Sequence, residues 1–209
     1  MKLKMTLANK ITLIRAAMAI VMFLLMVAEN KWTVIASSLL FGVAASTDWI
    51  DGRIARSTNT ATPFGAIVDP FVDKVLVGAA FFAFTELSII NVPVWAVFII
   101  ILRELMVSTL RVLAALDNYV MAAERWGKFK TTVQLIALGL IFFIVDVKLL
   151  LPITGGSLKT ALTFLDNLLG CLPYSITVIT AVVTALSGVS YLRNNWNMLK
   201  RSWSLPVND

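Results

Sequence analysis

Long apolar runs separated by short polar breaks make up most of this 209-residue sequence. A helix that crosses a membrane needs about 20 mainly apolar residues, and six runs come near or exceed that length. The pattern therefore predicts an all-α integral membrane protein with six transmembrane helices. The predicted helices comprise residues 11–28, 32–56, 63–87, 92–116, 122–147 and 172–195.

The breaks between the runs contain residues that favour turns or helix ends. Examples are Glu29-Asn30-Lys31, Ser57-Thr58-Asn59-Thr60 and Asn91-Val92-Pro93. The longest predicted connection, residues 148–171, contains Pro152 and has room for a short interfacial helix. The apolar pattern continues along the whole chain without an internal repeat, so residues 1–209 are predicted to form a single membrane domain.

Composition and charge support this prediction and give it an orientation. Charged residues make up 14% of the chain, whereas about a quarter of the residues in soluble domains are charged. Lys and Arg concentrate at the termini and in alternate connections, and positive charge marks the cytoplasmic side. Both termini and the active site are therefore expected to face the cytoplasm in a multi-pass protein of the cell membrane. The formal net charge of +6 suits an anionic lipid surface or an anionic substrate.

The chain contains no histidine and one cysteine, Cys171. A single cysteine excludes an intrachain disulfide. Without histidine, a metal ion would have to bind through oxygen ligands, which favours Mg²⁺, Mn²⁺ or Ca²⁺. A general base would have to be Asp, Glu, Lys, Tyr or Cys.

Four aspartates interrupt the second and third apolar runs. Asp48 and Asp51 are spaced i, i+3, and Asp69 and Asp73 are spaced i, i+4, so each pair shares one face of its predicted helix. The short connection makes these helices antiparallel neighbours, on which the four carboxylates can converge. A carboxylate inside a membrane costs roughly 2.5–3.5 kcal/mol. Two divalent cations would offset this charge while using only oxygen ligands.

Small residues and a cation accompany the aspartates. Gly52, Ala55 and Gly65 leave room for a bulky ligand near the backbone, and Arg56 offsets part of the negative charge. From the residues alone, two alternatives are interhelical ion pairs and the acidic lining of a divalent-cation transporter. A transporter would not require Gly52, Ala55 and Arg56 at fixed positions.

Residues 48–73 resemble the CDP-alcohol phosphotransferase family at every position of its motif: D-x-x-D-G-x-x-A-R, eight residues, then G-x-x-x-D-x-x-x-D. The family's six-helix layout also matches the predicted helices. The resemblance implies that two divalent ions, Mg²⁺ or Mn²⁺, are held by Asp48, Asp51, Asp69 and Asp73, and that Asp73 is also the catalytic base. It further implies that the CDP group is bound by Asp48, Gly52, Ala55, Arg56, Gly65 and Asp69.

The fourth predicted helix and the segment after it carry a second group of charges. Arg103 and Arg111 are eight residues apart on broadly one side of the helix, and Lys128 and Lys130 follow. Because Arg and Lys are suited to bind a phosphate dianion, these four residues are predicted to bind the phosphate of an acceptor alcohol. The alternative is charge that only sets the membrane orientation, together with a local Arg103–Glu104 pair.

Several segments resemble one subfamily, the bacterial phosphatidylglycerophosphate synthases. The matching pieces are residues 9–15, 64–74, 103–104 with 111, 127–131, and 187–188 with 191. This resemblance implies transfer of a phosphatidyl group from CDP-diacylglycerol to sn-glycerol 3-phosphate, which yields phosphatidylglycerol phosphate and CMP. It also implies a homodimer among membrane lipids, with no nucleic-acid partner. Inositol phosphate or phosphatidylglycerol remains an alternative acceptor.

Overall fold

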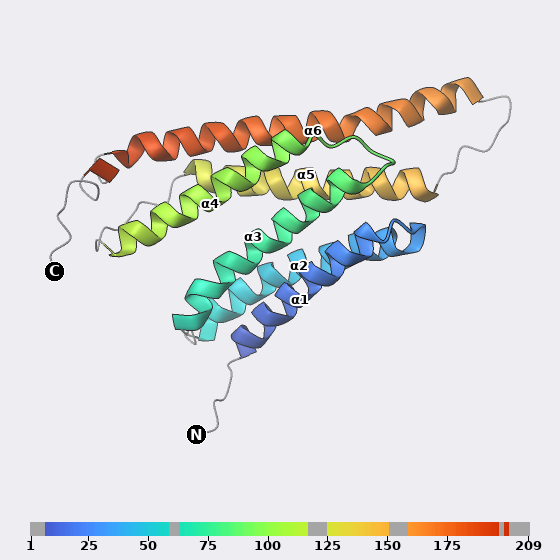
Figure 1. Ribbon diagram of the computed structural model, residues 1–209. Helices are drawn as coiled ribbons and strands as arrows, with labels where there is room; N and C mark the ends of the chain where they lie inside the picture. The colour runs from blue at the N-terminus through green and yellow to red at the C-terminus, as the bar shows by residue number, and fades with distance from the viewer. Residues whose placement is uncertain (1–6, 59–62, 117–124, 151–158, 197–198, 201–209) are drawn as a thin grey trace. The chain divides into compact units, whose positions relative to one another are not determined.

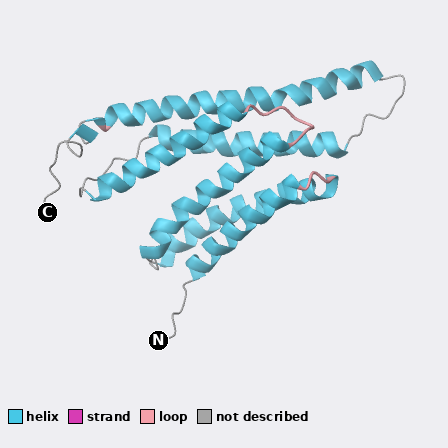
Figure 2. Ribbon diagram, viewed as in Figure 1, coloured by secondary structure: helices cyan, strands magenta, loops and turns pink. Residues whose placement is uncertain are grey.

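The computed structural model describes residues 7–58, 63–116, 125–150, 159–196 and 199–200, and its regular secondary structure over these residues is helical (Figures 1 and 2). Within these ranges, side chains are described except at residues 7–9, 48–67, 69–70, 115–116, 125–128 and 159–166. The helices are α1 (Leu7–Val27), α2 (Lys31–Thr58), α3 (Pro63–Glu86), α4 (Val94–Leu116), α5 (Arg125–Leu150) and α6 (Lys159–Asn194). The all-α prediction is therefore confirmed for the part of the chain that the structure describes.

Three stretches of the described helices are long and apolar enough to cross a membrane. They are Lys10–Val27 in α1, Phe129–Leu150 in α5 and Asn167–Asn194 in α6. They coincide with the first, fifth and sixth helices predicted from the sequence. These lengths and compositions are those of a multi-pass membrane protein.

The prediction of a long connection over residues 148–171 was wrong. Helix α5 continues to Leu150 and α6 begins at Lys159, so α6 runs as one helix through most of that segment (Figure 1). The prediction rested on Pro152, because a proline usually ends or kinks a helix, and it extended the connection as far as the start of the last apolar run at residue 172. Pro173 instead lies inside α6, where it removes one backbone hydrogen bond without ending the helix. The other helix boundaries agree with the predicted ones to about one turn.

A tight turn joins α1 to α2. Glu29 has a positive φ of 50°, which allows the chain to leave α1, and its N–H donates to the Met26 carbonyl at 3.1 Å. Asn30 then caps α2, because its Oδ1 accepts the Trp32 N–H at 3.1 Å and its carbonyl accepts the Val34 N–H at 2.9 Å. The turn therefore sets α1 beside α2, and α1 also packs against α3.

The helices pack as two compact units. Unit 1 comprises Met1–Val92 and Leu138–Tyr174, and its described interior is mainly apolar. Phe142 of α5 is buried in it, with its ring centroid 4.8 Å from that of Phe41 of α2 and 4.7 Å from that of Phe84 of α3. Such aromatic contacts stabilise a core beyond the area that they bury, so these rings join α2, α3 and the second half of α5.

Unit 2 comprises Pro93–Ala137 and Ser175–Asp209, and its described interior is more polar. The side chains of Arg103 on α4 and of Lys130 and Gln134 on α5 are buried. Helix α6 contributes a buried row of hydroxyl groups at steps of three or four residues, which places them on one face of the helix. This row consists of Thr177, Thr180, Thr184 and Ser187. Buried polar groups in a membrane helix commonly mark a functional site.

Candidate functional site

The four motif aspartates lie on two consecutive helices of unit 1. Asp48 and Asp51 belong to α2, and Asp69 and Asp73 belong to α3, which is continuous through Pro70. The helical spacing predicted within each pair is thus confirmed for the backbone. Of the four side chains, only that of Asp73 is described.

The other motif side chains lie outside the described set, so their convergence stays a prediction. These residues are Asp48, Asp51, Gly52, Ala55, Arg56, Gly65 and Asp69. Among the side chains that are described, no three from Asp, Glu or Cys come together as a metal-binding group.

Asp73 forms an ion pair with Arg15 of α1. The Arg15 Nη1 donates to Asp73 Oδ1 at 2.7 Å, which is the length of a strong charge-assisted hydrogen bond. The Arg15 side chain is 3% exposed and that of Asp73 is 45% exposed. The carboxylate is therefore held from the protein interior while part of it remains accessible to a ligand.

Sequence reasoning assigned Arg15 only to the positive charge near the N-terminus and to the resemblance in residues 9–15. The burial of Arg15 and of Thr12, one turn earlier, shows that this face of α1 points into unit 1. A polar face inside the apolar run Lys10–Val27 was the signal available in the sequence. An intramembrane arginine calls for a partner, and that partner could not be chosen before α1 was placed against α3.

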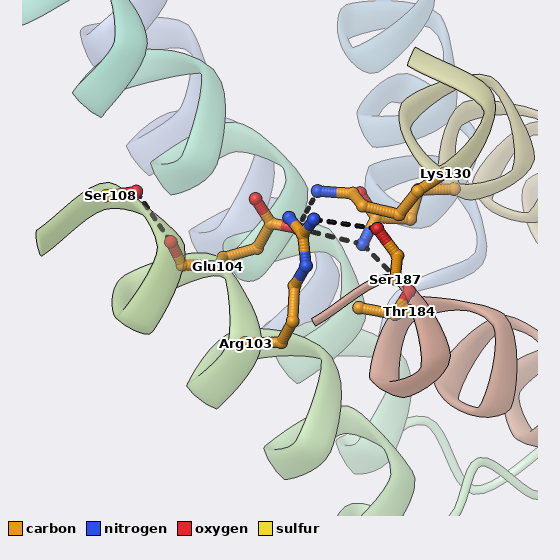
Figure 3. A network of polar contacts seen from close by, with 7 residues as sticks. Arg103, Glu104, Ser108, Lys130, Thr184 and Ser187 are labelled. Atoms are coloured by element: carbon orange, nitrogen blue, oxygen red, sulfur yellow. Dashed lines mark hydrogen bonds and ion pairs between the residues drawn. The ribbon is translucent and has the colours of Figure 1, made fainter. Parts of the chain in front are cut away.

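A second polar site connects α4, α5 and α6 within unit 2, and its side chains point toward one another (Figure 3). The Glu104 carboxylate lies at its centre. Glu104 Oε1 accepts hydrogen bonds from the Lys130 Nζ and from the Gln134 Nε2 at 3.2 Å, and the Arg103 Nη1 lies 3.5 Å from the same oxygen. We call this group, with the α6 hydroxyls described next, the Glu104 network.

Two hydroxyl groups of α6 complete the Glu104 network. The Arg103 Nη2 donates to the Ser187 Oγ at 2.9 Å, and the Gln134 Nε2 lies 3.3 Å from the Thr184 Oγ1. Both hydroxyl residues belong to the buried row on α6. The network therefore consists of Arg103, Glu104, Lys130, Gln134, Thr184 and Ser187.

Gly188 makes room for this arrangement. A Cβ atom at that position would lie 2.9 Å from the Cγ and 3.9 Å from the Cβ of Arg103, and 3.5 Å from the Met106 Cε. The first distance is too short for two carbon atoms, so only glycine lets the Arg103 side chain lie directly across α6.

The charges of the Glu104 network do not cancel. Arg103 and Lys130 carry two positive charges, Glu104 carries one negative charge, and the other members are neutral. Guanidinium has five N–H donors and ammonium has three, so the cations can bond an anion as well as Glu104. The network is chemically suited to bind an anion such as a phosphate.

The predicted phosphate-binding residues thus fall into three cases. Arg103 and Lys130 lie together in the Glu104 network, with Arg103 7% and Lys130 4% exposed. Arg111, also on α4, is exposed, and the Lys128 side chain lies outside the described set. Glu104, Gln134, Thr184 and Ser187 were missed as site residues, although the spacing of the α6 hydroxyls was visible in the sequence.

Comparison with known proteins gives a match over most of the chain. Residues 5–172 match the family model of CDP-alcohol phosphatidyltransferase. The CDP-diacylglycerol–glycerol-3-phosphate 3-phosphatidyltransferase of Bacillus subtilis (strain 168) is 33% identical over 210 residues, which cover 94% of this chain and 98% of the relative.

Two further relatives match over shorter stretches. A probable phosphatidylglycerophosphate synthase of Mycobacterium tuberculosis (strain ATCC 25618 / H37Rv) is 39% identical over 137 residues, or 64% of each chain. The CDP-diacylglycerol–glycerol-3-phosphate 3-phosphatidyltransferase of Escherichia coli (strain K12) is 43% identical over 113 residues, or 51% of this chain and 60% of the relative.

Proposed function

Since this chain belongs to the CDP-alcohol phosphatidyltransferase family, we propose that it transfers the phosphatidyl group of CDP-diacylglycerol to sn-glycerol 3-phosphate, giving phosphatidylglycerol phosphate and CMP. The Bacillus subtilis relative, which bears the name of this activity, aligns over nearly the full length of both chains. The observation that carries the choice of acceptor is the pair of buried cations, Arg103 and Lys130, in the Glu104 network. An acceptor with a phosphate group needs such cations, whereas serine or choline does not.

The proposed active site holds two divalent ions, Mg²⁺ or Mn²⁺. Asp48, Asp51, Asp69 and Asp73 would hold them, and the donor chemistry fits because carboxylate oxygens are the ligands that these ions prefer. Asp73, the described member of the four, is half-exposed and already oriented by Arg15. When bound, the ions would stabilise negative charge on the pyrophosphate and on the departing CMP.

Different residues of the chain have separate roles in proton transfer, in binding of the CDP group and in binding of the acceptor. Asp73 takes the proton of the acceptor hydroxyl as that oxygen forms a bond to the lipid-side phosphorus and the bond from this phosphorus to the CMP oxygen breaks. Gly52, Ala55 and Gly65 leave space for the CDP group, and Arg56 bonds the pyrophosphate. In unit 2, the acceptor phosphate is bound by Arg103 and Lys130, with Lys128 and Arg111 adding positive charge.

The proposed setting is a cell membrane crossed by six helices, with both termini and the active site on the cytoplasmic side. The three apolar stretches of α1, α5 and α6 and the distribution of Lys and Arg support this orientation. The lipid tails of the donor can then stay in the bilayer while its head group reaches the site. By analogy with the family we also expect a homodimer, which the mass of the detergent-purified protein would test.

The test of the proposed function is CMP release by the purified protein in detergent micelles. CDP-diacylglycerol is supplied with Mg²⁺ and with one acceptor at a time: sn-glycerol 3-phosphate, inositol phosphate or phosphatidylglycerol. We expect CMP and phosphatidylglycerol phosphate with glycerol 3-phosphate. Preference for another acceptor would contradict the proposed substrate but keep the family chemistry. Cation flux into liposomes without CMP release would indicate a transporter instead.

A further inference from the structure

We infer that Glu104 is a positioning residue for the acceptor phosphate: its carboxylate holds the Lys130 ammonium and the Arg103 guanidinium in one place. The inference rests on the proposed function, because it assigns Glu104 a role toward the acceptor of that reaction. Glu104 is absent from the CDP motif of residues 48–73, and from the sequence it was assigned only to a local pair with Arg103.

The first observation is that one carboxylate oxygen serves both cations. Glu104 Oε1 accepts from the Lys130 Nζ and lies 3.5 Å from the Arg103 Nη1. Two like charges this close repel strongly where water is scarce, and both side chains are largely buried. Without Glu104 the repulsion between the cations would be uncompensated, and removal of one partner from a buried ion pair is strongly destabilising, so we expect the two side chains to separate.

The second observation is that the Glu104 carboxylate is itself fixed from two other helices. The Gln134 Nε2 of α5 lies 3.2 Å from Glu104 Oε1 and 3.3 Å from the Thr184 Oγ1 of α6. Gln134 and Thr184 are almost fully buried. The carboxylate thus has a defined position next to the two cations (Figure 3).

A competing interpretation makes the opposite prediction. If the Glu104 carboxylate only competed with the acceptor phosphate for the two cations, replacing Glu104 with a neutral residue would strengthen acceptor binding. If Glu104 positions the cations, its neutralisation weakens acceptor binding and leaves donor binding unchanged. The direction of the change in the acceptor KM therefore separates the two roles.

The experiment is steady-state kinetics of the full-length chain carrying Glu104→Gln, with each substrate varied in turn. We expect the KM for glycerol 3-phosphate to rise roughly tenfold, with the KM for CDP-diacylglycerol changed less than about twofold. Glu104→Asp keeps the charge and should recover part of the loss. The matched control is Asp146→Asn, which removes a carboxylate on α5 that is hydrogen-bonded to Ser38 in unit 1, and should leave both KM values unchanged.

A double-mutant cycle with Lys130→Met tests whether Glu104 acts through Lys130. We expect the acceptor KM of the double variant to rise by clearly less than the product of the two single effects, because Glu104 then has only the Arg103 guanidinium to hold. An acceptor KM equal to the product of the two single effects would overturn the inference. An acceptor KM that is unchanged or lowered in Glu104→Gln would also overturn it.

Gln134→Leu provides a second variant if Glu104→Gln fails to fold. It removes a hydrogen bond to the carboxylate without leaving a new polar group in the helix, and we expect the acceptor KM to rise about threefold. An acceptor KM equal to that of Asp146→Asn would overturn the inference. Failure of the proposed function looks different, because the unaltered chain would then release no CMP with glycerol 3-phosphate.

Discussion

Arg15 and Asp73 form an ion pair of 2.7 Å between α1 and α3, with the arginine buried and the aspartate half-exposed. The pair couples the first helix of the chain to the residue proposed as catalytic base. A guanidinium bonded to one carboxylate oxygen restricts the rotation of the aspartate side chain. Helix α1 therefore takes part in orienting the proposed base and does more than anchor the chain in the membrane.

This pair predicts that Arg15→Gln lowers kcat more than it changes either KM. We expect a loss of roughly ten- to a hundredfold, the effect of removing one charged hydrogen bond worth about 1.5–3 kcal/mol. Arg15→Lys should recover part of the rate, because it keeps the charge but has different geometry. Lys10→Gln is the matched control, since Lys10 is an exposed cation on the same helix. A kcat for Arg15→Gln within twofold of the control would contradict the prediction.

Removal of divalent metal ions is predicted to abolish activity. Excess EDTA should stop CMP release, and added Mg²⁺ or Mn²⁺ should restore it, because four carboxylates with no histidine provide oxygen ligands only. Thermal unfolding should be measured in the same samples to check that the protein stays folded when the metal ions are removed. Full activity in excess EDTA would contradict the assignment of Asp48, Asp51, Asp69 and Asp73 as metal ligands.

Asp73→Asn is predicted to lower kcat by on the order of 10²–10⁴. Asparagine can still offer an oxygen to a metal ion or to Arg15, but it cannot accept a proton at neutral pH. Binding of CDP-diacylglycerol should be weakened but still detectable. If turnover stays within threefold of the unaltered chain, another residue is the base.

The two arginines of α4, Arg103 and Arg111, are predicted to contribute unequally to binding of the acceptor phosphate. Arg103→Ala should raise the KM for glycerol 3-phosphate about ten- to a hundredfold, because Arg103 is buried in the Glu104 network. Arg111→Ala should raise it less, since Arg111 is exposed and water weakens its attraction to a phosphate. The measurement is the KM for each substrate after a check that the variants are folded. A rise in the KM for CDP-diacylglycerol instead would place these arginines at the donor site.

The positions of the helices and the placement of each aspartate pair on one helix face could be predicted from the sequence, because both depend on local spacing. Apolar runs of sufficient length specify helices, and the intervals between Asp48 and Asp51 and between Asp69 and Asp73 specify shared helix faces. Pro173 shows the limit of local reasoning: the same residue can end a helix or lie within one, and here it lies within α6.

The ion pairs between helices could not be predicted in the same way. Arg15 could have paired with any acidic residue of a neighbouring helix. The rotation and depth of α1 against α3 determine that it pairs with Asp73. Glu104 follows Arg103 directly in the sequence, which suggested a local pair. Its contacts with Lys130 and Gln134 depend on how α4 and α5 pack.

Gly188→Ala is predicted to weaken acceptor binding through Arg103. The new Cβ would lie 2.9 Å from the Arg103 Cγ, near the base of the side chain, where rotation of the distal bonds gives little relief. Arg103 must then shift away from α6 and lose its 2.9 Å bond to Ser187. We expect the KM for glycerol 3-phosphate to rise roughly three- to tenfold, which is less than for complete loss of a hydrogen bond to a charged group because the Arg103 guanidinium is displaced and not removed, with the KM for CDP-diacylglycerol unchanged.

Gly139→Ala on α5 is the matched control for Gly188→Ala, because a Cβ there meets no atom within 4 Å. Alanine in place of an unconstrained helical glycine stabilises a helix by roughly 0.5–1 kcal/mol, so this control should be neutral or slightly more stable to heat. The same gain in helix propensity applies at position 188, and any loss there must come from the contact with Arg103. If both variants show the same acceptor KM, Arg103 can move without consequence, and the Glu104 network does not determine acceptor affinity.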